Sequence, residues 1–206
     1  MMKFNYSPGS CALASRIALE EAGAKYEAVW MDLEDYYEQC WPAYLCVNPK
    51  GCVPSLETER GVLTENPAIL AYVAQAYPAA NLAPLNDPYA FAEMQAFNSY
   101  LCSTIHVSHA HRVWGTRWSD DPAIVDAMKL KVTKNMTDGF ALIENKMLKG
   151  PWVMGAQYTL SDPYLFTLAR WLKGDGVDVA RFPKVAAHMK RMEQRPAAQR
   201  ALKGEG

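Results

Sequence analysis

The sequence lacks the paired cysteines that mark a zinc protein or a disulfide scaffold. Its five cysteines, at positions 11, 40, 46, 52 and 102, are odd in number and form no C-x-x-C pair. This spacing argues against a disulfide framework and against a structural zinc site. We therefore expect no metal, and we expect free thiols in a reducing compartment.

A strong charge of either sign and a long apolar run are also absent. The 206 residues carry a formal net charge of −1, so no overall basic field favours nucleic acid or a membrane surface. No apolar stretch approaches the roughly 18 to 20 residues that span a bilayer. The N-terminal segment has no apolar stretch typical of a signal peptide. We expect a cytoplasmic protein that binds neither nucleic acid nor membrane.

The first third of the chain mixes strand and helix signals. Half of all residues are hydrophobic and 21% are charged, a balance that supports a folded core. Residues 3–6 are expected to form a strand, and residues 10–22 a helix rich in Ala and Leu that ends at Gly23. Residues 26–31 are strand-prone. This order predicts a βαβ unit with a parallel crossover.

An irregular stretch follows and ends in the turn sequence NPKG at 48–51. Strand signals then flank a hairpin turn at 59–61. Asn66 is expected to cap a helix that has Pro67 at its first position and that runs to Pro78. The first domain is therefore expected to span residues 1–78.

The remainder of the chain shows no good strand. A Pro-rich linker at 79–87 precedes a second domain at 88–206, which we expect to be entirely helical. Within it, Thr159 and Asp162 are predicted to form a capping box of purely structural importance, with Ser161 as the alternative cap. The helical patterns cover residues 88–117, 122–148, 160–173 and 183–194.

Four segments, in this order and spacing, resemble the glutathione transferase family. They are YSPGSC at 6–11, NPKGCVP at 48–54, LTENPAI at 63–69 and YTLSDPYLF at 158–166. The likeness covers essentially the whole chain and is greatest to the bacterial beta class, whose thiol stands where Cys11 stands. It implies an α/β plus all-α protein: a thioredoxin-like βαβαββα domain that binds glutathione, and a C-terminal helical bundle.

The resemblance implies an enzyme that binds glutathione as co-substrate and presents its thiolate to a small hydrophobic electrophile. Family members usually form homodimers, and we expect one here. Two alternatives stay open. One is a glutathione-dependent thiol–disulfide reductase or peroxidase that uses Cys11. The other is a non-enzymatic binding protein of the same fold.

Cys11 is the first candidate catalytic residue. It follows a Pro-Gly turn at a predicted helix start, where unpaired N–H groups favour negative charge and lower the pKa of a thiol. The resemblance implies that Cys11 contacts the glutathione sulfur. Ser10 and Tyr6 are the rival activating hydroxyls, because other classes use Ser or Tyr near this position. The plain alternative is that Cys11 is an inert core residue.

Two further segments are candidates for binding the glutathione backbone. A cis bond between Val53 and Pro54 would let Val53 pair with an extended tripeptide; the alternative is a trans proline at a strand start. The helix start at Glu65 and Asn66 suits the α-carboxylate of the γ-glutamyl group, and Glu65 suits its ammonium group. Asn66 stands where the family usually has Ser, Gly or Thr. Its plain alternative is a helix cap.

The glycine end of glutathione has no assigned partner. The run EDYY at 34–37 lies where beta-class members often carry a lysine for the glycine carboxylate. The resemblance therefore leaves open which residue holds that carboxylate here.

The helix predicted over 88–117 is expected to supply the opposite wall of the site. Ser99, Ser103 and His106 follow i, i+4, i+7 spacing and share one face of a regular helix. The resemblance implies that this face, with Thr104, lines the cleft and that His106 lies near the glutathione sulfur. There it could steady a thiolate or exchange a proton.

The histidines of this helix do not predict a metal site. On a regular helix His106 and His109 face together, whereas His111 points away. The plain alternative for His109 and His111 is a polar helix face. The other interpretation is that they shape the acceptor site together with Arg112, Trp114, Arg117 and Trp118.

Overall fold

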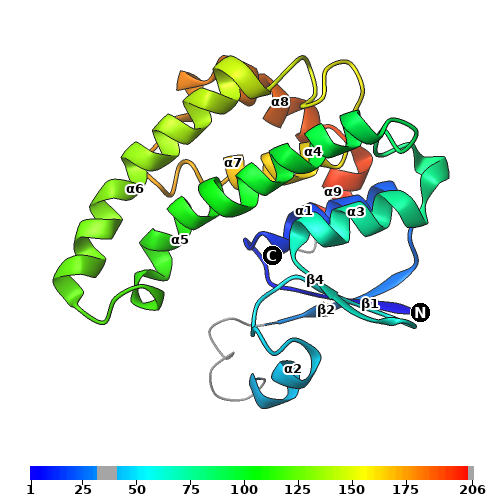
Figure 1. Cartoon of the computed structure of the whole chain (residues 1–206), viewed down its shortest axis with the longest axis horizontal. Coiled ribbons are helices and arrows are strands. Elements are labelled where there is room, and N and C mark those ends of the chain that lie inside the picture. Colours follow the sequence, from blue (N-terminus) through cyan, green and yellow to red (C-terminus); the bar gives the residue numbers. More distant parts are fainter. Residues whose placement is uncertain (32–40, 204–206) are drawn as a thin grey trace.

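The computed structural model describes residues 1–31 and 41–203, and it places a small mixed sheet beneath an arch of helices (Figure 1). The four strands lie in the order β2-β1-β3-β4. β1 pairs in parallel with β2 and antiparallel with β3, which pairs antiparallel with β4. Their bounds are β1 Met2–Tyr6, β2 Tyr26–Trp30, β3 Ser55–Thr58 and β4 Gly61–Thr64. The predicted parallel crossover and hairpin are confirmed.

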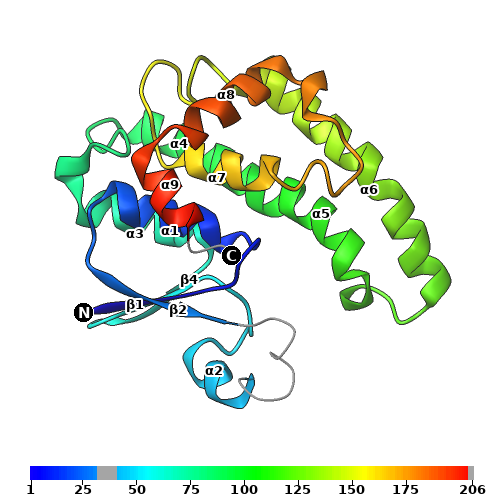
Figure 2. The same ribbon diagram turned by 180° about the vertical axis from the view of Figure 1, so that it is seen from behind.

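Three helices belong to this first unit. α1 (Ala12–Glu21) and α3 (Asn66–Ala76) lie between the sheet and the helical arch, whereas α2 (Trp41–Val47) lies beyond the sheet on the other side (Figures 1 and 2). Seven of the ten residues of α1 are buried, and the small side chains among them let neighbours approach the helix on several sides. The arrangement confirms the predicted thioredoxin-like domain, and it brings the N-terminal end of α1 to the junction with the helical domain.

The rest of the chain is helical, as predicted. Within the described residues no helix combines the length and the apolar character needed to cross a membrane. Short 3₁₀ turns lie at Pro78–Ala80, Gly115–Arg117 and Val179–Arg181, and π-helical segments lie at Leu101–Ile105 and Ile143–Met147. The α-helices are α4 Pro88–Tyr100, α5 His106–Val113, α6 Pro122–Leu142, α7 Ser161–Ala169, α8 Pro183–Glu193 and α9 Pro196–Leu202.

The helix α9 was missed by the sequence analysis. It has only seven residues, too few for a hydrophobic period to stand out. Figure 2 shows α9 beside α1, so this helix packs against the N-terminal domain. The two helices share a separate apolar cluster with α7 and α8, formed by Leu13, Ile17, Phe166, Met192, Ala198 and Ala201.

A buried carboxylate holds together three segments of the helical domain. The carboxylate of Asp162 accepts a hydrogen bond from the backbone N–H of Thr159, with 2.7 Å between nitrogen and oxygen. This bond confirms one contact of the predicted capping box. The other oxygen of Asp162 accepts from the backbone N–H of Val153 at 2.8 Å and lies 2.9 Å from Nε2 of His188. The helix itself begins at Ser161. Because the side chain is fully buried, each of these donors depends on Asp162 for its partner.

We therefore expect Asp162→Ala to lower the free energy of unfolding by about 2 to 4 kcal/mol, because buried donors lose their acceptor. Urea denaturation of the purified protein measures this. The matched control is Asp138→Ala, at an exposed carboxylate on α6, which should change stability by no more than about 0.5 kcal/mol. Equal effects of the two substitutions would contradict the structural role of Asp162.

Candidate functional site

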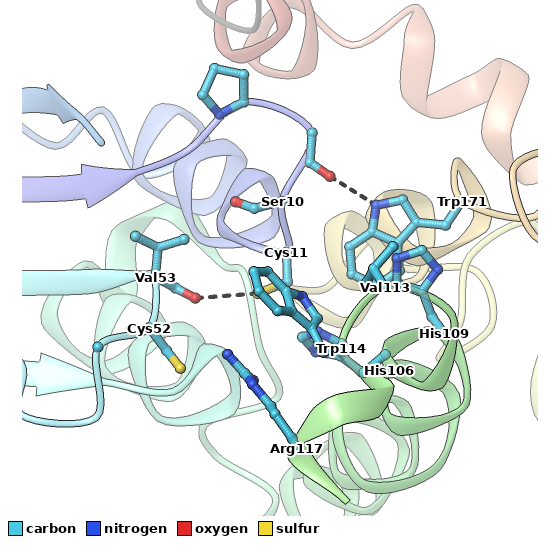
Figure 3. A pocket seen from close by; sticks show the side chains of 14 residues that line it. Ser10, Cys11, Cys52, Val53, His106, His109, Val113, Trp114, Arg117 and Trp171 are labelled. Carbon is cyan, nitrogen blue, oxygen red and sulfur yellow. Dashed lines mark hydrogen bonds between the residues drawn. The ribbon is translucent and has the colours of Figure 1, made fainter. Parts of the chain in front are cut away.

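Two adjoining hollows lie between the sheet domain and the helical domain. The larger, of about 360 Å³, lies between the turn that carries Cys11 and the end of α5 (Figure 3). The smaller, of about 130 Å³, extends toward the start of α3. Cys11, Cys52, Val53 and His106 line both, so the two hollows meet at these residues.

Val53 lies where the hollows meet. The bond between Val53 and Pro54 is cis, as predicted. The carbonyl oxygen of Val53 accepts a hydrogen bond from the thiol of Cys11, with 3.4 Å between sulfur and oxygen (Figure 3). This bond joins the turn before α1 to the segment before β3.

The Cys11 thiol is protonated in this setting. Cys11 immediately precedes α1, as predicted, but it is only 8% exposed. Burial, together with the nearby Cys52, raises the pKa of Cys11 to about 12. The expectation of a lowered pKa is therefore wrong, because the loss of solvation outweighs the favourable helix end. Cys11 acts here as an S–H donor.

The two rival hydroxyls have different placements. The hydroxyl of Ser10 donates to the carbonyl of Ser7 at 2.6 Å and accepts from the backbone N–H of Ala12 at 3.2 Å, so Ser10 supports the turn while lining the larger hollow. Tyr6 lines neither hollow. Its ring lies in the core, stacked 6.2 Å from that of Phe4. Because β1 directs this side chain into the core, the placement of Tyr6 favours Ser10 over Tyr6 as the activating hydroxyl, a role that stays a prediction.

The start of α3 forms the far end of the smaller hollow. Glu65 has a φ of 72°, a conformation that non-glycine residues rarely adopt and that often occurs at binding sites. Lys50 lies 2.5 Å from its carboxylate and also donates to the hydroxyl of Thr64 at 2.7 Å. Glu65 therefore has a fixed direction at the edge of the hollow.

Asn66 does not cap α3, contrary to the prediction. The helix begins at Asn66 itself. Its side-chain oxygen accepts from the hydroxyl of Ser15 at 2.6 Å, and its side-chain nitrogen donates to the carbonyl of Cys11 at 2.9 Å. Both ends of the amide are thus used to tie α3 to α1, and the side chain is buried rather than presented to a ligand.

The opposite wall differs from the prediction because the helix is not regular. The segment Leu101–Ile105 is π-helical and so has more residues per turn than an α-helix, and Cys102 and His106 of this region line the smaller hollow. Ser99, Ser103 and Thr104 are exposed and line neither hollow. Their contact with glutathione therefore stays a prediction that the two hollows of a single chain do not support.

His106 lies where it was expected, at the junction of the hollows. Burial, with the nearby charges of His109 and Arg117, lowers the pKa of His106 to about 4. The imidazole is therefore neutral at physiological pH. It lies 5.1 Å from the ring of Trp171, centroid to centroid.

A buried network behind His106 was missed by the sequence analysis. Nδ1 of His109 lies 2.9 Å from the carboxylate of Asp175, and Nε of Arg112 lies 2.8 Å from the same group. The ring of His109 stacks on Trp171 at 4.1 Å, and the indole N–H of Trp171 donates to the carbonyl of Gly9 at 2.9 Å (Figure 3). This chain of contacts fixes α5 against the turn that carries Cys11.

Of the residues expected to shape the acceptor site, some line the larger hollow and others lie away from it. The ring of His111 packs 4.5 Å from that of Trp118, and neither residue lines the hollows, whereas Trp114 and Arg117 line the larger one. Among residues 1–31 and 41–203 no group of three His, Cys, Asp or Glu side chains is placed to hold a metal. The run EDYY at 34–37 lies outside the described residues.

The raised pKa of Cys11 predicts slow alkylation. At pH 8, iodoacetamide should modify the exposed Cys46 at least about tenfold faster than Cys11, because only the thiolate reacts. Peptide mass spectrometry follows each site separately, and the Cys11 rate should still rise above pH 9. A Cys11 rate that levels off below pH 8 would contradict the buried, protonated thiol.

The lowered pKa of His106 predicts a specific loss of stability in acid. The His106 ring takes up a proton near pH 6.5 in the unfolded chain and only near pH 4 in the folded chain. The stability that the neutral His106 contributes to the fold is therefore complete above pH 6.5 and disappears as the pH falls toward 4. Over that interval the wild type should lose more stability than His106→Gln in urea denaturation. Proton NMR of the His106 ring gives an independent reading. Titration of this ring near pH 6.5 would refute the prediction.

Comparison with known proteins agrees with the geometry. Residues 1–75 match the family model of the glutathione S-transferase N-terminal domain, and residues 111–196 match the model of the C-terminal domain. The glutathione S-transferase GstA of Escherichia coli O157:H7 is 32% identical, over 100% of this chain and 99% of the relative.

Solved structures show the same similarity. A glutathione transferase homolog from Sulfitobacter, with bound glutathione, is 40% identical with a TM-score of 0.95, over 98% of this chain and 97% of that one. The beta-class glutathione S-transferase of Sphingomonas chungbukensis is 33% identical with a TM-score of 0.86, over 99% and 98%. The chain belongs to the glutathione S-transferase family.

Proposed function

We propose that the chain is a glutathione transferase that binds glutathione across the smaller hollow and presents its sulfur to an electrophile in the larger one. The observation that carries this proposal is the meeting of the two hollows at Cys11, Val53 and His106. The smaller hollow, which Glu65 and Asn66 line, thereby opens into a roomier, largely apolar cavity. A tripeptide thiol and an apolar acceptor need this arrangement to bring their reacting atoms together.

The smaller hollow fits the γ-glutamyl end of glutathione. Unpaired backbone N–H groups at the start of α3 suit its α-carboxylate, and the carboxylate of Glu65 suits its ammonium group. The role of Asn66 is proposed to be indirect, because its side chain already binds Ser15 and the carbonyl of Cys11. It orients the helix start, while its backbone faces the ligand.

The thiol and the imidazole at the junction suit the stabilisation of a sulfur anion. The Cys11 thiol can transfer its hydrogen bond from the carbonyl of Val53 to the glutathione thiolate. His106 is neutral and can donate a ring N–H or accept the thiol proton. A raised pKa disfavours Cys11 as a nucleophile, so the reductase and peroxidase alternative has less support than conjugation.

The oligomeric state, the cellular location and the domain boundaries remain proposals. We propose a homodimer in the cytoplasm that acts on a small electrophile, in line with the family. We also keep the division into a glutathione-binding domain at 1–78, a linker at 79–87 and a helical acceptor-side domain at 88–206.

Calorimetry tests glutathione binding directly. The reduced protein should bind glutathione with a free energy of roughly −8 to −4 kcal/mol. Glu65→Gln should weaken binding about tenfold, because it removes a charge-assisted contact. Glu59→Gln, at an exposed position of the β3–β4 turn, is the matched control and should leave binding unchanged. Absence of wild-type binding would refute the proposal.

Paired substitutions separate a hydrogen-bonding Cys11 from a nucleophilic one. With glutathione and 1-chloro-2,4-dinitrobenzene, Cys11→Ser should keep kcat/KM within about threefold because it keeps a donor. Cys11→Ala should lose about tenfold, corresponding to one hydrogen bond to a charged atom. Cys46→Ser, at an exposed thiol, is the control. Complete loss of activity in both variants would point to a nucleophile instead.

A further inference from the structure

The larger hollow has a distinctive charge pattern. Of the described residues that line it, Arg117 alone carries a permanent charge, and none is Asp or Glu. Most of its lining surface is apolar, with Ala110, Val113 and Trp114 on the helical side. A cation at the edge of a largely apolar cavity without acidic side chains favours a ligand that carries an anion.

Arg117 is held in place but keeps its hydrogen-bond donors available. It ends the 3₁₀ turn after α5, and its guanidinium lies 4.7 Å from the ring centroid of Trp114. Figure 3 shows the side chain reaching from the helical domain toward Cys52. The ion pairs found among the described residues do not include Arg117.

We propose that Arg117 binds a carboxylate in the larger hollow. A guanidinium presents a planar fork of N–H donors that matches a carboxylate, and the face of Trp114 keeps this fork oriented. The proposal rests on the proposed function, because the cleft that Arg117 borders is the one assigned to glutathione and its acceptor.

Two sources can supply this carboxylate. Glutathione bound with its γ-glutamyl end at Glu65 and its centre at Val53 directs its other end out of the smaller hollow, and an extended tripeptide spans roughly 10 Å. In this orientation its glycine carboxylate would enter the larger hollow, which Val53 and Arg117 both line. The other source is an acidic group on the acceptor, whose apolar body would lie against Val113 and Trp114.

The solvent exposure of Arg117 limits how strongly it can attract a carboxylate. Arg117 is exposed to solvent, so the attraction is weaker than for a buried pair and decreases with salt. We expect the loss of the charge to cost about tenfold in affinity for the ligand that carries the carboxylate. The loss should be smaller at 0.5 M than at 0.05 M sodium chloride.

The glycine arm of the test compares two ligands by calorimetry. Glutathione and its glycine amide differ only in the charge at that end. They are titrated into wild type, Arg117→Gln, Arg117→Lys and the control Arg60→Gln, at the exposed β3–β4 turn. If glycine is the partner, Arg117→Gln lowers the affinity ratio of acid to amide about tenfold, Arg117→Lys recovers part of it, and Arg60→Gln leaves it unchanged.

The acceptor arm uses saturating glutathione and two electrophiles, 4-chloro-3,5-dinitrobenzoate and the corresponding benzamide. The thiolate attacks the ring carbon that bears chlorine; the C–S bond forms, chloride leaves with the C–Cl electron pair, and the thiol proton passes to solvent. If the acceptor supplies the carboxylate, Arg117→Gln lowers the kcat/KM ratio of benzoate to benzamide about tenfold.

A change in either ratio supports the proposal and identifies the source, and unchanged ratios in both arms overturn it. If wild type binds no glutathione, the proposed function fails but Arg117 is still tested. In that case, the affinities for 1-naphthoate and 1-naphthamide, measured by quenching of tryptophan fluorescence, test the carboxylate site. Preference for the acid in wild type that is absent in Arg117→Gln supports the carboxylate site, and no preference overturns it.

Discussion

The close packing of α1 between the sheet and the helical domain is the constraint on which the rest of the structure depends. Ala12, Ala14 and Ala18 are completely buried, so neighbouring segments approach the backbone of this helix on several sides. The same packing removes Cys11 from solvent at the helix start. It also lets the Asn66 amide bridge the Ser15 hydroxyl and the Cys11 carbonyl. The electrostatics of the site are therefore a consequence of how tightly one small-residue helix is enclosed.

Local sequence signals were enough to predict the sheet, its crossover and the helical character of the second domain. The resemblance to glutathione transferases, rather than these local signals, indicated that Cys11, Val53, Glu65 and His106 surround one cleft, and all four line the two hollows. The errors arose where geometry departs from regularity or depends on distant contacts. The spacing of Ser99, Ser103 and His106 assumed an α-helix, and the π-helical segment separates them.

Contacts between segments far apart in the chain were beyond sequence reasoning. Asp175 follows α7 in a glycine-flanked turn that carries no motif, yet its buried carboxylate faces both His109 and Arg112. The pKa of Cys11 was mispredicted for the same reason: the helix end is visible in the sequence, whereas the burial that opposes it comes from Val53 and the helical domain. Long-range burial decides the protonation of this thiol.

The charges of the cleft are separated along its length. Glu65, paired with Lys50, lies at one end and the cation Arg117 at the other, while the junction between them holds the protonated Cys11 and the neutral His106. A zwitterionic tripeptide bound across this field gains orientation from both ends. Its sulfur would then meet hydrogen-bond donors without a full counter-charge. Donors stabilise a developing anion in a partly dry site and leave its electron pair available for attack, whereas a tight ion pair would reduce its nucleophilicity.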